Sequence, residues 1–501
     1  MTGAARPAGT WVRDLSRADR FLLVLVGAHV AITVAVFLQI SHGPLVGDET
    51  AYVNGGKALS NLVRDWGSLR APDGAEVAQN VVGSGWFMPG MSVLLTPLYL
   101  VAPHADGAVL RGYIGVTTTL VFLLTVLRVR RSWGALYAGA LLVVPGLVPV
   151  WAAFSLAAWG DLLAGILIVL LLVELVELSR SLRSGQAPSL GDGVRLGLLA
   201  IAVVYLRSST SLLVAGLGLV SVVAALALLR GVERRRAALS ATVAALAFVA
   251  LLLPWSVGAS MTLDGRVVTT TSVPTVLANT FGDRDQVCFG PCDPGSTTWF
   301  SPLRYSRETA RVTGHSEMDV AEQMSAYARQ GVTSRSYSHD VLVDLRSYVR
   351  EPERFYGYLR ADPDQDRAQD VVIERSTRVL VWAAFAVGVG LLICVVRRPR
   401  EDQVISILLK LSLGALLTQP FVHIAGPRYW TTAAPVLGLA AALLIRQAAL
   451  RFAPGLTGPG SQDAITGAEI ALGRWLTLFQ ALLSAGVILV ATVVVVLATT
   501  P

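Results

Sequence analysis

Long apolar segments recur along the whole sequence and constrain its fold more than any other feature. A helix needs about 20 mostly apolar residues to cross a bilayer, and about eleven segments approach that length. They are residues 21–40, 107–127, 134–152, 160–178, 193–206, 210–229, 237–257, 379–396, 403–420, 430–449 and 475–498. Only 15% of the chain is charged, against roughly 25% in ordinary soluble domains. The sequence therefore predicts an all-α polytopic membrane protein.

The positions of the arginines predict how these spans are oriented. The formal charge is +7, and Lys57 and Lys410 are the only lysines. If the N-terminus is cytoplasmic, the loops on that side are 128–133, 179–192, 230–236, 397–402 and 450–474, and each carries arginine. Cytoplasmic loops of membrane proteins are enriched in this way. Membrane orientation thus explains the basic charge, and we expect no nucleic-acid partner.

Two assignments of apolar segments keep this charge pattern intact. Segment 86–101 is interrupted by Pro89, Gly90 and Pro97, so we expect it to lie at the interface. Segment 193–229 is divided at Arg207 into two short spans. The predicted parts are a transmembrane catalytic module at 1–257 with a first outer loop at 41–106, an extracytoplasmic segment at 258–378, and C-terminal spans at 379–501. Interfacial helices are expected in the first outer loop, after Tyr52, and at 338–360.

The pair Asp48-Glu49 directly follows the first span, on the predicted outer side. One explanation is a helix N-cap followed by an acidic first-turn residue. The other is a general base that takes a proton from an acceptor hydroxyl. Asp161 begins the fourth span on the same side. It is either an ordinary helix-start residue or a second acid that binds acceptor hydroxyls or a metal.

Cations near the outer ends of spans form a second group of candidates. Arg207 lies between two apolar spans, and Arg428-Tyr429 and His423 lie in the last outer turn. Arginine grips phosphate bidentately, so these residues could neutralise a phosphate leaving group. The alternatives are snorkelling toward lipid headgroups for the arginines and a structural role for the histidine.

Cys288 and Cys292 both lie in the long outer segment, in Cys-Phe-Gly-Pro-Cys. An oxidising compartment favours a disulfide over free thiols. A metal site is the weaker interpretation, since no second Cys or His pair follows.

The order of these features resembles the GT-C superfamily of integral membrane glycosyltransferases, particularly its bacterial protein-mannosyltransferase-like and aminoarabinose-transferase-like branch. The corresponding residues here are Asp48 and Glu49, the Pro-Gly-containing segment 86–90, Asp161, Pro254 and Trp255, and His423, Arg428 and Tyr429. The resemblance covers roughly residues 20–450. The single Pro-Gly, where many relatives have Pro-Pro, and the Trp-Gly before Asp161 depart from the pattern and leave the substrate open.

The resemblance implies a GT-C fold, a polyprenyl-monophosphate sugar as donor and inversion at the anomeric carbon. It implies Asp48 as base, assisted by Glu49 and Asp161. The residues that it assigns to the donor phosphate are Arg207, Arg428, Tyr429, His423 and Lys57. The acceptor would be an extracytoplasmic cell-envelope glycan, lipid or protein. A divalent cation held by the carboxylates is left open, because many relatives transfer sugar without one.

The composition, with arginine over lysine and abundant Ala, Val and Gly, is typical of a high-GC bacterium such as an actinobacterium. Mannose or arabinofuranose would then be natural sugars, and the protein would lie in the plasma membrane. Two other classes stay open. A lipid or glycan transporter would usually show matching halves, which the sequence lacks. A diphosphate-donor glycan ligase or polymerase would carry arginines in its large outer loop, as this chain does.

Overall fold

The computed structural model describes residues 16–282, 309–350, 359–360, 368–422, 430–452 and 467–499. These residues form helices, with no strand among them, which confirms the all-α prediction. Nine of the described helices are long and apolar enough to cross a membrane. They belong to α1 (Arg17–Ile40), α5 (Gly107–Ser132), α8 (Asp161–Arg183), α10 (Ser211–Leu228), α11 (Gly231–Thr262), α18 (Ala368–Ile393), α19 (Arg400–Leu416), α20 (Trp430–Phe452) and α21 (Gly467–Thr499).

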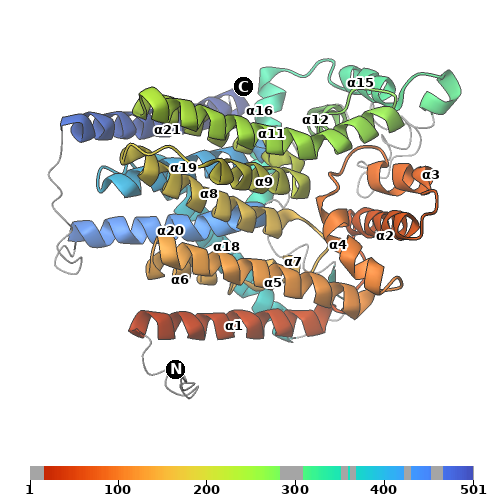
Figure 1. The fold of residues 1–501 in the computed structure, drawn as a ribbon, viewed down its shortest axis with the longest axis horizontal. Coiled ribbons are helices and arrows are strands. Elements are labelled where there is room, and N and C mark those ends of the chain that lie inside the picture. Colours follow the sequence, from red (N-terminus) through yellow and green to blue (C-terminus); the bar gives the residue numbers. More distant parts are fainter. Residues whose placement is uncertain are drawn as a thin grey trace.

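Shorter helices fill the connections. The first loop holds α2 (Glu49–Gly67), α3 (Gly74–Val77), the π-helix η2 (Ala78–Val82) and α4 (Gly90–Val101). Next along the chain are α6 (Ala135–Val143), α7 (Pro149–Phe154), α9 (Leu190–Leu206) and the 3-10 turn η3 (Ser208–Thr210). The later ones are α12 (Val273–Phe281), α15 (Glu317–Ala328), α16 (Ser334–Arg350) and the 3-10 turn η4 (Gln419–Phe421). In Figure 1, α2, α3 and α15 lie beside the end of the bundle opposite to the end where α1 begins.

The predicted span 134–152 is the clearest departure from the sequence analysis. It divides into α6 and α7, because Pro145 has no N–H to donate and fixes its own φ. Gly146 allows the tight turn: a Cβ placed on it would lie 2.1 Å from the Leu142 carbonyl oxygen. The buried His29 ring of α1 donates from Nδ1 to the Gly146 carbonyl oxygen at 2.7 Å. Side-chain hydrogen bonding thus compensates for the broken ladder.

The break at Arg207 and the interruption of segment 86–101 are both present, but α9 has 17 residues and is not among the nine candidate spans of the described residues. α9 ends at Leu206, Arg207 is its C-cap, and a 3-10 turn leads into α10. Segment 86–101 contributes only the 12-residue α4, which is too short to span a bilayer. The helix predicted at 338–360 starts earlier, at Ser334 in α16.

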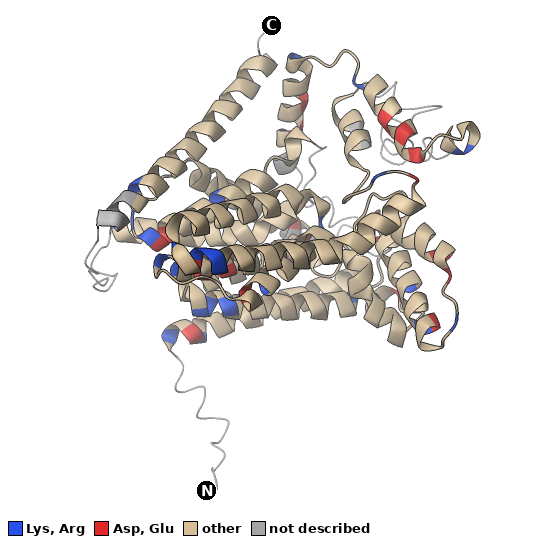
Figure 2. Cartoon of the chain, turned by 45° about the horizontal axis from the view of Figure 1, so that its top comes forward, with Lys and Arg blue, Asp and Glu red and all other residues tan. Residues whose placement is uncertain are grey.

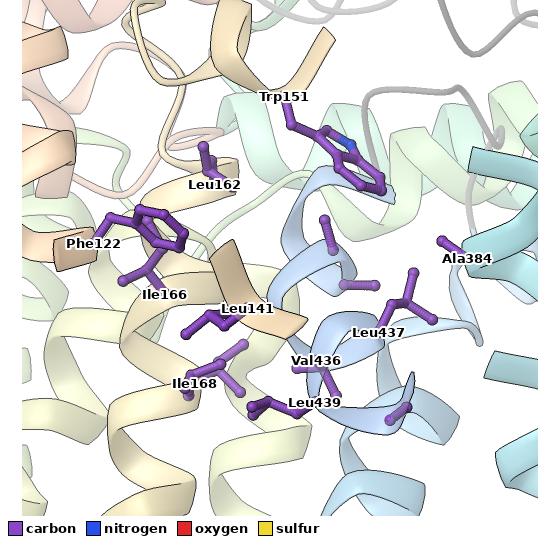
Figure 3. Close-up of a cluster of buried hydrophobic side chains, with 14 of the residues drawn as sticks. Phe122, Leu141, Trp151, Leu162, Ile166, Ile168, Ala384, Val436, Leu437 and Leu439 are labelled. Atoms are coloured by element: carbon purple, nitrogen blue, oxygen red, sulfur yellow. The ribbon is translucent and has the colours of Figure 1, made fainter. Parts of the chain in front are cut away.

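α8 and α20 form the centre of the bundle. They are the two most deeply buried of the long helices, and Figure 3 shows their side chains meeting those of α5, α6, α7 and α18. Gly165 permits the close approach, because a Cβ there would lie 2.4 Å from the Thr432 carbonyl oxygen. Small residues at helix crossings are the usual solution in membranes, where van der Waals packing drives association.

α9 and α11 pack through a similar motif. Gly193 and Gly197 are four residues apart on α9, and they face Ser240 and Ala244, which are four apart on α11. A Cβ on either glycine would lie 2.4 Å from the carbonyl oxygen opposite. This is the small-xxx-small arrangement that brings membrane helices into backbone contact. It fixes the position of α9, which carries Arg207 at its end.

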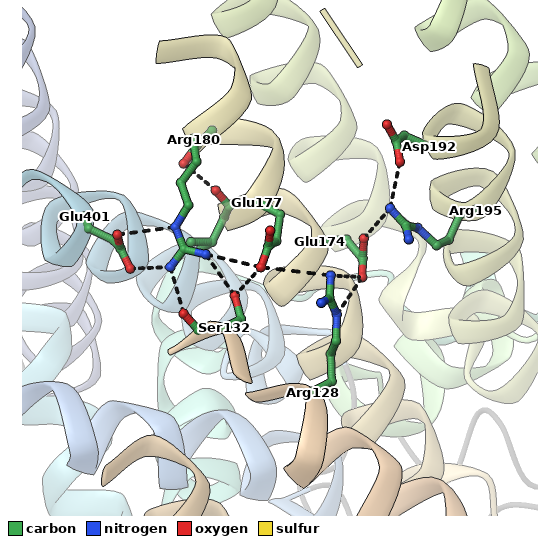
Figure 4. A network of polar contacts seen from close by, with 10 residues as sticks. Arg128, Ser132, Glu174, Glu177, Arg180, Asp192, Arg195 and Glu401 are labelled. Atoms are coloured by element: carbon green, nitrogen blue, oxygen red, sulfur yellow. Dashed lines mark hydrogen bonds and ion pairs between the residues drawn. The ribbon is translucent and has the colours of Figure 1, made fainter. Parts of the chain in front are cut away.

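Positive charge gathers at one end of the bundle (Figure 2), which we call the basic end. Residues at that end include Arg17, Arg130, Arg131, Arg180, Arg183, Arg234, Arg235 and Arg236. Ion pairs cross-link the helices there (Figure 4): Arg180 contacts Glu401 at 2.5 Å, and Arg195 contacts Glu174 at 2.8 Å. The first-loop helices lie at the opposite end, as the charge pattern predicts.

A polar seam joins α19 to α21. Gln403, Ser406 and Lys410 lie on one face of α19, and Thr477, Gln480 and Ser484 lie on the facing side of α21. The seam also provides hydrogen-bond donors for backbone carbonyls just after the end of α18. Lys410 Nζ donates to the Cys394 carbonyl oxygen, and Gln480 Nε2 donates to that of Val396 at 2.9 Å. Carbonyls beyond the last helical turn would otherwise lack partners in the membrane.

Candidate functional site

Asp48 lies where the chain turns from α1 into α2. Gly47 supports the turn with a φ of +57°, and Asp48 takes the N-cap position, half-buried. Its carboxylate makes no capping hydrogen bond to the described first turn of α2. In a usual N-cap, a side-chain oxygen accepts from the N2 or N3 amide. Asp48 has the N-cap position but not this hydrogen bond.

Glu49 has different surroundings, although it is the next residue. Oε1 accepts from Arg111 Nη1 at 2.6 Å and from the Ala158 amide at 2.7 Å. Oε2 accepts from Arg111 Nη2 at 3.1 Å and from the Val46 amide at 2.9 Å. A carboxylate offers about four acceptor positions, and all are used here. With 0% of its side chain exposed, Glu49 is suited to holding the site together rather than to exchanging protons with a substrate.

Arg111 is the residue that the sequence analysis missed. It lies on α5, 1% exposed, and donates to the Pro44 carbonyl oxygen at 2.9 Å as well as to Glu49. It thereby joins α5 to the turn before α2 and to the start of α2. The available signal was an arginine inside the predicted span 107–127, where a charge is costly and is expected to be paired.

Asp161 and Arg207, which the sequence predicted for two different tasks, form an ion pair with each other. Asp161 opens α8 and is 1% exposed, whereas the Arg207 side chain at the end of α9 is 12% exposed. Gly160 lets the two helix ends meet: a Cβ there would lie 2.4 Å from the Leu206 carbonyl oxygen. Asp161 therefore holds the guanidinium of Arg207 at this end of the bundle.

A cavity of about 170 Å³ opens beside the start of α2. It is lined by Ala51, Tyr52 and Asn54 of α2, by residues 79–84 and 86–88, and by Ser92 of α4. Ala51 and Tyr52 lie three and four residues after Asp48, which places all three on one face of the helix. Asp48 is thus one helical turn from the cavity wall.

The far wall of the cavity is tied to the helices that carry Arg207 and Trp255. Met88 packs against Val204 and Trp255, and a Cβ on Gly90 would lie 2.5 Å from the Tyr205 carbonyl. The wall consequently packs directly against the end of α9. The structure brings Asp48, the cavity and the Asp161–Arg207 pair to the same end of the molecule.

Other predicted site residues are placed elsewhere or lie outside the described residues. Lys57 Nζ lies 5.5 Å above the centre of the Tyr99 ring of α4, and Lys57 does not line the cavity. The residues that lie outside the described ranges are His423, Arg428, Tyr429, Cys288 and Cys292.

Two of the three predicted carboxylates are already engaged by protein groups. Glu49 uses its oxygens on Arg111 and backbone amides, and Asp161 is paired with Arg207. Within the ranges that the structure describes, no group of three or more His, Cys, Asp or Glu side chains could hold a metal ion.

Comparison with known proteins adds no family. No protein-family model matches the chain, and no curated protein sequence matches it.

Proposed function

We propose that this chain is a multi-pass membrane glycosyltransferase that uses a polyprenyl-monophosphate sugar. The observation that carries the proposal is the cavity of about 170 Å³ one helical turn from Asp48, at the end of the bundle opposite to the basic end. Lipid-linked donors present their sugar at the membrane surface, where the first-loop helices lie. A partly enclosed site one helical turn from a carboxylate suits transfer of such a sugar.

The proposed reaction is a single displacement. The acceptor hydroxyl oxygen bonds to the anomeric carbon while the bond from that carbon to the phosphate oxygen breaks, which inverts the anomeric centre. Asp48 takes the hydroxyl proton, and the carrier phosphate leaves with the bonding electrons. Because the transition state has oxocarbenium character, the negative Asp48 also stabilises it.

Arg207 is the described cation best suited to the leaving phosphate. Its side chain is partly exposed, and Asp161 holds it at the correct end of the bundle. Arginine can offer two parallel N–H donors to phosphate while another edge of the guanidinium contacts a carboxylate. Arg428, Tyr429 and His423 stay proposed partners in this role.

The sugar and acceptor belong to the proposal as well. Mannose or arabinofuranose on a decaprenyl-phosphate-type carrier fits the actinobacterium-like composition, with a cell-envelope glycan, lipid or protein as acceptor. The protein would then lie in the bacterial plasma membrane, with its site facing away from the cytoplasm.

Transfer from a panel of radiolabelled polyprenyl-phosphate sugars tests the proposal directly. Purified protein in nanodiscs is supplied with candidate acceptors, and wild type is compared with Asp48→Asn. Loss of a general base slows a reaction by about a hundredfold to ten-thousandfold, so the variant should retain at most about 1% of the rate. Asp73→Asn is the matched control, because Asp73 caps α3 in the same loop and asparagine caps equally well.

The outcomes separate the competing functions. Asp48-dependent transfer from one monophosphate sugar establishes the class and the donor together. Transfer that survives Asp48→Asn overturns the assignment of the base. Failure of every monophosphate donor with folded protein rejects the proposal, and diphosphate-linked donors and a transport assay then decide between the ligase and the transporter.

A further inference from the structure

The cavity beside α2 has an unusual backbone on one side. Its wall includes the π-helix Ala78–Val82, a rare conformation that occurs frequently at functional sites. The loop that follows turns through Gly83 and Gly85, with φ of +54° and +71°. This loop is fastened from outside, because Thr271 donates from its amide to the Gly85 carbonyl and from Oγ1 to that of Ser84. The wall is therefore held in a fixed shape.

The chemistry of the lining is polar but uncharged. Of the described residues that line the cavity, none is Asp, Glu, Lys, Arg or His. The polar side chains are the amides Asn54, Gln79 and Asn80 and the hydroxyls of Ser84 and Ser92. Amides and hydroxyls can both donate and accept. Ser92 already donates to the Tyr52 carbonyl oxygen at 3.2 Å, and Asn80 Nδ2 donates to that of Glu76 at 3.1 Å, so Ser92 offers a ligand only an acceptor and Asn80 keeps one N–H and its oxygen. Such a lining matches a ligand whose own groups donate and accept at the same atoms.

Aromatic side chains supply a second kind of surface. Tyr52, Trp86 and Phe87 line the cavity, and the Tyr52 and Phe87 rings lie 5.4 Å apart with an interplanar angle of 57°. A sugar ring has an apolar C–H face that packs on such rings, and a rim of hydroxyls that pairs with amides. An ionised amino or carboxylate group buried among these lining residues, in contrast, would lose water without gaining an opposite charge from any of them.

We propose that this cavity binds the glycosyl group and selects a neutral, hydroxyl-rich sugar over an amino sugar or a uronic acid. This inference rests on the proposed function for its place in a reaction, but its binding claim stands on the lining alone. The inference favours a neutral pentose or hexose as the transferred sugar over a cationic sugar such as aminoarabinose.

Ligand binding without turnover tests the inference. Saturation-transfer NMR on the full chain in nanodiscs uses four probes: methyl mannoside, methyl arabinofuranoside, a methyl 4-amino-4-deoxyarabinoside and a methyl glucuronide. We expect the two neutral glycosides to bind and the two charged ones to bind about tenfold more weakly or not at all. Equal or stronger binding of a charged probe overturns the inference, as does the absence of binding by every probe.

Two variants assign the signal to the cavity. Asn54→Asp adds a carboxylate to the wall, so binding of the amino glycoside should rise about tenfold and that of the glucuronide should stay weak. Trp86→Leu should weaken neutral glycosides. Gln323→Glu is the matched amide-to-carboxylate control, because Gln323 is exposed on α15 and outside the lining. Binding that neither variant changes, in protein with wild-type thermal unfolding, places the sugar elsewhere and overturns the inference.

Activity distinguishes this failure from failure of the proposed function. If Asp48→Asn abolishes transfer while the cavity variants change neither binding nor sugar preference, the enzyme assignment stands and the cavity assignment fails. If neutral glycosides bind in the cavity but no donor is turned over, the binding site stands and the transferase proposal fails.

Discussion

Asp48 and Glu49 are neighbours in sequence, yet the structure gives them opposite surroundings. Asp48 is half-buried and lies one helical turn from the cavity wall, whereas Glu49 is enclosed by Arg111 and two backbone amides. Glu49 has all of its carboxylate positions engaged and holds the start of α2, the helix that Asp48 caps. The value of Glu49 to the site would be to fix where α2 begins, and with it the direction of the Asp48 side chain.

Removing Arg111 tests this role. Arg111→Met leaves Glu49 buried and unpaired, which should lower the free energy of unfolding by about 3–5 kcal/mol. The double variant Glu49→Gln with Arg111→Met removes the orphaned charge and should recover part of that loss. Thermal or chemical unfolding in nanodiscs measures both. Arg236→Met is the control, because its pair with Glu233 is exposed and is worth about 0–1 kcal/mol.

If the free energy of unfolding of Arg111→Met equals that of the wild type, the Arg111–Glu49 pair does not stabilise the fold. If the double variant is as unstable as Arg111→Met alone, the loss comes from packing around the arginine and not from the unpaired carboxylate.

The candidate site was only partly predictable from the sequence. Asp48, Asp161 and Arg207 could be identified because charges at span ends are costly unless they have a purpose. The ion pairs of the site could not be predicted. Arg111 and Glu49 are 62 positions apart, and only the packing of α5 against the first loop brings them together. Sequence patterns report local periodicity, whereas the partner of a buried charge is a property of tertiary structure.

Among the helices, the α9–α11 contact sets the position of Arg207. Gly193 and Gly197 allow the backbone of α9 to rest on that of α11, and α9 then ends at the cavity wall. The sequence analysis identified both spans and the turn at Arg207 but not this crossing. Helix existence follows from apolar length, whereas the choice of a neighbour depends on small residues whose partners lie on another helix.

A side chain at Gly197 should separate the two helices. Gly197→Val places atoms where the Ala244 carbonyl oxygen now lies, and overpacking of this kind costs about 1–3 kcal/mol. We expect a lower unfolding temperature and weaker donor binding, because Arg207 moves with α9. Gly216→Val on α10 is the matched control, since nothing lies within 4 Å of a Cβ there. If Gly197→Val and Gly216→Val have the same unfolding temperature and donor affinity, the packing of α9 on α11 does not depend on backbone contact at Gly197.

For the whole molecule, the distribution of charge predicts the orientation in the membrane. The basic end and the end that carries the first-loop helices are opposite (Figures 1 and 2), and basic loops normally face the cytoplasm. The number of crossings was less predictable: one apolar segment of nearly full length breaks at Pro145 and Gly146 into α6 and α7. Apolar length alone cannot reveal such a break when a histidine on another helix compensates for it.

Cysteine labelling in intact cells tests the orientation. Ser68→Cys lies after α2 and Ser184→Cys lies after α8, both exposed and at opposite ends. In a background with the three native cysteines replaced by serine, a membrane-impermeant maleimide should label Ser68→Cys directly. Ser184→Cys should react only after the membrane is permeabilised. The reverse pattern would place the candidate site in the cytoplasm.

The polar seam between α19 and α21 has a consequence for how the protein is made. α19 carries Gln403, Ser406 and Lys410, and α21 emerges from the ribosome well after it. Until α21 arrives, the amine of Lys410 lacks the Ser484 hydroxyl and the end of α18 lacks Gln480. α19 therefore gains its polar partners on α21 only when synthesis is almost complete. A chain that stops before α21 would keep the Cys394 carbonyl oxygen as a partner of Lys410 but would lack the Ser484 hydroxyl, so this intramembrane amine would be only partly satisfied.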